Sequence, residues 1–74
     1  MNVEVKLSAT LRIGRFDRQT VELPDGSTVA GLLERLSLTR KEVAAVAVNS
    51  QHAAQDRVLE PGDQIAIYPP VAGG

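Results

Sequence analysis

Hydrophobic and charged residues alternate at the start of the chain, where charged residues separate Val3, Val5 and Leu7. A period of two is typical of a half-buried strand, so we expect these three residues to face the core. A second alternating run at 20–23 follows a turn-prone stretch, and the two runs together predict a hairpin. The hairpin should end at 24–26, Pro-Asp-Gly, because proline cannot donate to a ladder and glycine permits a tight turn.

A helical spacing begins after this turn. Four apolar residues occupy the i, i+3, i+4 and i+7 positions of one helical face: Val29, Leu32, Leu33 and Leu36. This spacing predicts an amphipathic helix from about 28 to 37, which Ser27 or Thr28 can cap through a side-chain oxygen. Gly31, inside the helix, indicates either a close approach of the helix to the sheet or a merely tolerated glycine.

Two more strands follow the helix. The nearly all-apolar run 43–48 is short and is followed by Asn49, so it predicts a buried central strand rather than a second helix. Pro61-Gly62 suits a type II turn, and the alternating segment 64–68 predicts the last strand. The order strand, strand, helix, strand, strand indicates the α+β class, a β-grasp roll in which one main helix covers a mixed sheet of about four or five strands.

Composition limits the classes of function. A chain of 74 residues forms a single domain, 1–74, and is too short for a large core. Its 8 basic and 9 acidic residues include no extended basic run, so nucleic acid is not an expected partner. The sequence has neither a membrane-length apolar stretch nor a signal-peptide pattern, so we expect no membrane contact and a cytoplasmic location.

The residue types that carry most protein chemistry are scarce. There is no cysteine, which excludes disulfides, thiolate nucleophiles and thiolate metal ligands. The single histidine, His52, has polar neighbours and no second ligand at metal-binding spacing, so we expect an exposed loop histidine and no metal site. Nucleophile-elbow and phosphate-loop motifs are absent from the sequence. Covalent chemistry must therefore use a group other than these side chains.

The last seven residues of the sequence carry its most specific motif: Tyr68, Pro69, Pro70, Val71, Ala72, Gly73 and Gly74. This segment resembles the C-terminal signature of the small subunit of molybdopterin synthase, in the MoaD/ThiS family of ubiquitin-like sulfur carriers. Weaker matches to this family run along the chain, at 11–12, 23–26, 28–29, 32–33, 48–49, 59 and 62–63. The related thiazole-pathway carriers share the fold and the Gly-Gly end but usually lack Pro-Pro. Ser8 and Ile13 depart from the molybdopterin carriers, which usually have an aromatic residue and a glutamate at these positions.

The resemblance implies a carrier rather than an enzyme. In such a carrier the Gly74 carboxylate is adenylated by a ubiquitin-activating-type enzyme, which uses ATP and Mg²⁺, and a sulfur donor protein then supplies the sulfur of a thiocarboxylate. The large subunit of molybdopterin synthase would receive this sulfur, and the carrier chain itself would bind no cofactor. Glycines have no Cβ and can enter a narrow channel, while prolines limit the entropy lost on docking. We therefore expect a mobile tail from about 69 to 74.

Partner contacts are expected along this tail and at one aromatic residue. The tail residues concerned are Gly73, Ala72, Val71, Pro70, Pro69 and Tyr68. Phe16 either anchors a partner or packs against its own hairpin. Three other functions stay open on the sequence: a carrier for thiamine thiazole or another thiolated metabolite, a ubiquitin-like modifier conjugated to lysines, and a non-covalent interaction domain.

Overall fold

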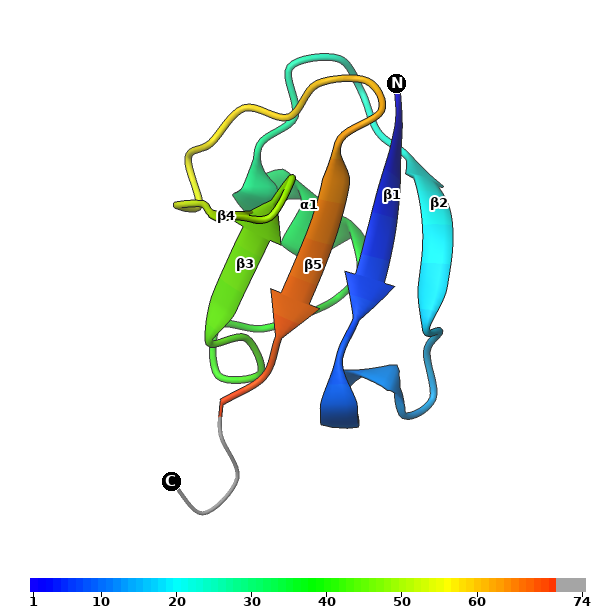
Figure 1. Cartoon of the computed structure of the whole chain (residues 1–74), viewed down its shortest axis with the longest axis vertical. Coiled ribbons are helices and arrows are strands. Elements are labelled where there is room, and N and C mark those ends of the chain that lie inside the picture. Colours follow the sequence, from blue (N-terminus) through cyan, green and yellow to red (C-terminus); the bar gives the residue numbers. More distant parts are fainter. Residues whose placement is uncertain (71–74) are drawn as a thin grey trace.

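The computed structural model describes residues 1–70, which form a five-stranded sheet and one α-helix (Figure 1). The strands are β1 (Asn2–Leu7), β2 (Arg18–Glu22), β3 (Ala45–Val48), β4 (Gln51–His52) and β5 (Gln64–Tyr68). Their order in the sheet is β2-β1-β5-β3-β4; β1 and β5 are parallel, and the other neighbouring pairs are antiparallel. The helix α1 (Val29–Arg35) lies across one face of the sheet. This arrangement confirms the expected ubiquitin-like β-grasp roll.

The first hairpin forms as the alternation predicts. β1 pairs with β2 in a register that places Val3 opposite Val21 and Val5 opposite Gln19. Val3, Val5 and Leu7 are each at most 1% exposed and belong to the same core cluster as the apolar residues of α1. Burying a side chain of this size contributes about 1.5–3 kcal/mol relative to leaving it exposed. The sheet therefore has one face packed on α1 and one open face.

The helix α1 is capped as predicted but ends earlier than predicted. Thr28 is the N-cap, and its hydroxyl oxygen accepts a hydrogen bond from the Gly31 N–H at 3.2 Å. The helix ends at Arg35 because Leu36 has a ψ of 1° and Ser37 has a positive φ of 58°. Its core residues are Val29, Leu32 and Leu33, which are buried, and Leu36, which is half-buried.

Gly31 does not mark a close approach to the sheet. A Cβ at this position would meet nothing nearer than 3.8 Å, and the atoms that it would meet belong to the start of the helix. The proposed close approach is therefore wrong, and the glycine is tolerated rather than required.

β3 differs from its prediction. It begins at Ala45 rather than at 43, and it lies fourth in the sheet, whereas the central strand is β5. Val46 and Val48 are buried, while Ala45 and Ala47 are half-buried. Alanines thus occupy the open face of an ordinary alternating strand, and for this reason the run looks continuously apolar in the sequence.

Two short elements were not predicted, the 3₁₀ helix η1 (Ala9–Arg12) and the strand β4. η1 places Leu11 in the core at 3% exposure. Asn49 and Ser50 join β3 to β4 with positive φ values of 51° and 69°, as a type I′ turn requires. His52 is exposed as expected, but it lies in β4 rather than in a loop.

The turn before β5 has the predicted type II features. Gly62 has a φ of 84°, and the Asp63 N–H donates to the Glu60 carbonyl at 3.1 Å. Asp63 is a buried charged residue; its carboxylate accepts hydrogen bonds from Asn49 Nδ2 at 2.9 Å and from the Glu60 N–H at 2.8 Å. Asn49 Oδ1 accepts a further bond from the Gln64 N–H at 2.9 Å. This network joins the β3–β4 turn to the start of β5.

Candidate functional site

β5 leads the chain to the site that the sequence indicates, at the end of the sheet beyond Tyr68. Ile65 and Ile67 are 2% and 0% exposed and lie in the core. The strand is hydrogen bonded on both sides up to its last residue. The Ser8 N–H donates to the Ile67 carbonyl at 3.2 Å, and the Ala44 N–H donates to the Tyr68 carbonyl at 2.8 Å. The segment that follows is therefore attached to a firmly held strand.

Tyr68, Pro69 and Pro70 are the described start of the predicted tail. The Tyr68 side chain is 44% exposed, Pro69 is half-buried, and Pro70 is exposed. Pro69 has no N–H to donate, which ends the ladder, and its fixed φ restricts the directions in which the chain leaves the sheet. The remaining predicted contacts, which lie outside the described residues, are Val71, Ala72, Gly73 and Gly74. The expected mobility of the tail stays a prediction.

Two loops, the one after η1 and the one between α1 and β3, lie beside the end of β5 (Figure 1). An ion pair joins them. Arg15, after η1, donates from Nη2 to Oε2 of Glu42, in the α1–β3 loop, at 2.9 Å. Glu42 Oε1 accepts hydrogen bonds from the Thr39 N–H at 3.2 Å and from the Thr39 hydroxyl at 3.0 Å. The Thr39 N–H, the Thr39 hydroxyl and Arg15, in that order of importance, lower the pKa of Glu42 below its usual value of 4.5. The carboxylate therefore stays charged at neutral pH and connects both loops.

Phe16 lies in the loop between η1 and β2. It is half-buried and packs against the core, in agreement with the packing interpretation of the sequence. Its contact with a partner stays a prediction. The exposed apolar residue of this loop is Ile13, at 75% exposure, which is one of the positions that depart from the molybdopterin carriers.

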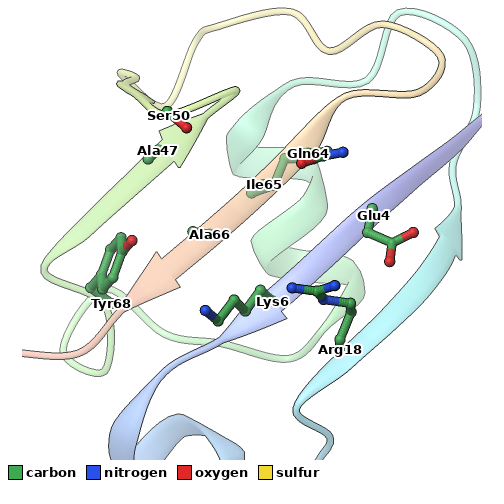
Figure 2. A pocket seen from close by; sticks show the side chains of 9 residues that line it. All are labelled: Glu4, Lys6, Arg18, Ala47, Ser50, Gln64, Ile65, Ala66 and Tyr68. Carbon is green, nitrogen blue, oxygen red and sulfur yellow. The ribbon is translucent and has the colours of Figure 1, made fainter.

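The open face of the sheet contains a hollow of about 160 Å³ next to Tyr68 (Figure 2). Ala47 on β3 and Ala66 on β5 are register partners and form its floor. Lys6 on β1 and Arg18 on β2 line one side of it. Its other lining residues are Glu4, Ser50, Gln64 and Ile65.

Sequence reasoning did not single out Lys6 and Arg18. Alternation places Lys6 on the face opposite Val5 and Leu7, but the proximity of the two cations depends on the register of the hairpin. The loop at 8–17, which includes η1, sets this register, and the sequence does not reveal its conformation.

Two kinds of site are absent from the described part of the chain. Residues 1–70 contain no group of three or more His, Cys, Asp or Glu side chains that could hold a metal ion. None of the helices within this range is long and apolar enough to cross a membrane.

The sequence is similar to one characterised family along almost its whole length. The family model of the ThiS family matches residues 5–74. The sulfur carrier protein ThiS of Escherichia coli strain K12 is 35% identical over 63 residues, which cover 80% of this chain and 94% of that protein.

Solved structures share the fold. A putative molybdopterin converting factor subunit 1 from Pyrococcus furiosus has a TM-score of 0.80 at 30% identity, covering 96% of this chain and 99% of that one. Small archaeal modifier protein 1 from Haloferax volcanii has a TM-score of 0.78 at 25% identity, covering 95% and 98%. A chain in the complex of subunits 1 and 2 of molybdopterin-converting factor from Helicobacter pylori has a TM-score of 0.69 at 26% identity, covering 100% of both chains.

Proposed function

This chain belongs to the ThiS family and is a sulfur carrier of the ThiS/MoaD type, and from this membership we propose that the Gly74 carboxylate is the group that carries sulfur. The carrier would be adenylated at Gly74, converted to a thiocarboxylate, and used as a sulfur source in molybdenum- or tungsten-pterin cofactor synthesis. Catalysis would lie in the partner proteins.

The observation that carries this proposal is the way in which β5 ends. Ser8, which follows β1, donates to the Ile67 carbonyl, and Ala44, which precedes β3, donates to the Tyr68 carbonyl. Two prolines follow directly. Six residues, 69–74, separate this fixed point from the terminal carboxylate, and a chain of six residues spans at most about 20 Å. Because the chain has no cysteine, a carboxylate at the end of this segment is the group best placed to accept sulfur.

The proposed chemistry begins with the activation of a poor electrophile. A Gly74 carboxylate oxygen attacks the α-phosphorus of ATP in the adenylating enzyme, and pyrophosphate leaves. The terminal sulfur of a persulfide on the donor protein then attacks the acyl carbon and displaces AMP. A thiol next cleaves the resulting acyl disulfide, which releases the thiocarboxylate and leaves the thiol sulfur joined to the donor sulfur as a disulfide. In the synthase, this sulfur attacks the pterin intermediate, and hydrolysis of the acyl–sulfur bond restores the carboxylate. ATP and Mg²⁺ act at the adenylating enzyme, whereas the carrier positions the acyl carbon.

Different findings support different functions for the activated carrier: two sulfur acceptors and one conjugation reaction. The Pro69-Pro70 pair and the similarity to the Pyrococcus furiosus protein support molybdopterin, with the large subunit of the synthase as partner. The similarity to the Escherichia coli sulfur carrier supports the thiamine thiazole pathway as the second candidate. The similarity to small archaeal modifier protein 1 supports conjugation to lysines as the third.

Intact mass measurement tests the carrier function. We expect the full chain, incubated with the adenylating enzyme of its own organism, ATP, Mg²⁺ and a sulfur source, to gain the mass of one oxygen-to-sulfur exchange. Deletion of Gly74 should prevent this gain because it misplaces the acyl carbon. A matched control, Gly31→Ala in α1, changes a glycine at which an added Cβ would meet nothing nearer than 3.8 Å, and it should react like the wild type. Sulfur transfer to the Gly74 deletion at the wild-type rate would refute the proposal.

A second experiment distinguishes the acceptors. The thiocarboxylated carrier is supplied in parallel to the large subunit of molybdopterin synthase with its pterin substrate and to a thiazole synthase. We expect consumption of the thiocarboxylate in the first reaction; consumption in the second alone would favour thiamine thiazole. Covalent conjugates that survive denaturation and reducing agent in cells would favour the modifier function, since a carrier returns as free protein.

A further inference from the structure

The cations Lys6 and Arg18 are arranged unfavourably in the free protein. They are register partners on β1 and β2, both are exposed, and both side chains lie on the open face of the sheet (Figure 2). Like charges directly opposite each other destabilise an antiparallel pair. No carboxylate of residues 1–70 lies at ion-pair distance from either of them, whereas Arg12 pairs with an acid at 3.7 Å and Arg15 at 2.9 Å.

Lys6 and Arg18 belong to a row of four register partners that crosses the sheet. The other two residues of this row are small and leave space beside the two cations. The register across four strands gives the order Arg18, Lys6, Ala66 and Ala47. The two alanines project little from the sheet, and the hollow of about 160 Å³ lies over them. A volume near 150 Å³ holds a benzene-sized group. The hollow is therefore large enough for one side chain.

The hollow adjoins the start of the tail. Tyr68 lines the hollow and is also the last residue of β5. A protein that encloses Gly74 must lie within about 20 Å of Tyr68, because six residues span no more than this distance. At the other end of the hollow lies Glu4, whose carboxylate accepts a hydrogen bond from the Thr20 hydroxyl at 3.5 Å. Figure 2 shows Glu4 beside Arg18 and the Lys6 side chain extending toward Tyr68, so an acidic group is favoured on the Tyr68 side of the cations, away from Glu4.

We propose that a Glu or Asp side chain of the adenylating enzyme that receives the tail docks in this hollow and pairs with Lys6 and Arg18. The inference rests on the proposed function, because capture of the tail is what brings the enzyme to this face. A carboxylate can accept two parallel hydrogen bonds from a guanidinium and another from an ammonium group. Docking replaces a repulsive contact of the free carrier with an attractive contact in the complex, and it accelerates association at low ionic strength.

Two neutral variants, Lys6→Gln and Arg18→Gln, test the docking site in the full-length chain. Each removes the like-charge contact, so each should raise the melting temperature of the free carrier. Each should also weaken binding to the adenylating enzyme of the same organism at least tenfold and reduce the dependence of Kd on salt. Ala66→Val, which fills the hollow and keeps both charges, should weaken binding as well. Arg35→Gln, on α1 and also exposed, is the matched control and should bind within twofold of the wild type.

The outcomes separate this inference from the proposed function. Wild-type affinity and salt dependence in both cation variants would overturn the docking site, even when the wild-type carrier accepts sulfur. An equal loss of affinity in Arg35→Gln would also overturn it, because it would show that only net charge matters. Binding of ATP or inorganic phosphate to the free carrier, lost in the cation variants, would assign the hollow to a small anion instead. If the cation variants bind more weakly but the wild type gains no sulfur, the carrier function alone is refuted. If the wild type does not bind the enzyme, the docking site and the carrier function are both refuted.

Discussion

Asp63 holds three segments of the chain together from a buried position. Its carboxylate binds Asn49 and the Glu60 N–H, and its carbonyl accepts a hydrogen bond from the Glu4 N–H at 2.9 Å. Both donors are part-buried, so each retains part of the cost of leaving water when it loses its acceptor, and the carboxylate matters through the groups that it satisfies. This side chain holds the start of β5 together with the backbone hydrogen bonds of Asp63 and Gln64.

Replacement of this carboxylate should therefore destabilise the fold. Asp63→Ala leaves Asn49 Nδ2 and the Glu60 N–H without their acceptor, and we expect the free energy of unfolding to fall by about 1–3 kcal/mol. Urea unfolding measures the change. The exposed Asp56 provides the control, since Asp56→Ala should stay within about 0.5 kcal/mol of the wild type. Equal effects of the two substitutions would show that the network is not stabilising.

The lowered pKa of Glu42 predicts that the stability of the protein depends on pH. Its folded-state pKa is lowered, so its contribution to stability is present above its unfolded pKa and is lost as the pH falls through the folded pKa, below 4.5. Glu42→Gln should therefore melt below the wild type at neutral pH, and the two melting temperatures should converge toward pH 3. Thermal unfolding between these pH values checks this result, with the exposed Glu34→Gln as the control. A melting difference independent of pH would contradict the role of the charged carboxylate.

At the scale of elements, α1 contributes to the core through a narrow set of residues. Leu33→Ala should cost about 2–5 kcal/mol, because Leu33 is buried and the cavity cannot collapse fully. Leu36→Ala should cost less, since Leu36 follows the end of the helix and is only half-buried. Chemical denaturation of both variants measures the difference. A change below about 0.5 kcal/mol for Leu33→Ala would mean that this residue is not a core residue.

Element types were largely predictable from the sequence because they depend on local patterns. Alternation in β1 and β5 and the spacing of the leucines in α1 each reflect a single buried face. Strand order depends instead on which distant edges meet, so the central position of β5 could not be read from its own residues. The candidate site likewise has one part that follows from local sequence and one part that depends on strand order. The tail motif is contiguous and was visible, whereas the row from Arg18 to Ala47 exists only once four strands are in register.

At the scale of the whole molecule, the core of the described residues lies before the segment that we propose to carry sulfur. The core cluster of the described residues ends at Ile67, and none of its members follows β5. A chain truncated after Pro70 should therefore unfold within about 0.5 kcal/mol of the full chain. A chain truncated before Gln64 should fail to fold, because β1 and β3 lose the strand that lies between them. Circular dichroism and denaturant titration check both results, and a marked destabilisation on removal of 71–74 would contradict this separation.

The position of β5 also determines when the protein can fold during its synthesis. β1 is the first strand to leave the ribosome, and β5, which lies between β1 and β3, is the last. A nascent chain without β5 has two separate hairpins and a detached helix, which do not form a stable sheet. The sheet can therefore be completed only after β5 has been synthesised and has left the exit tunnel.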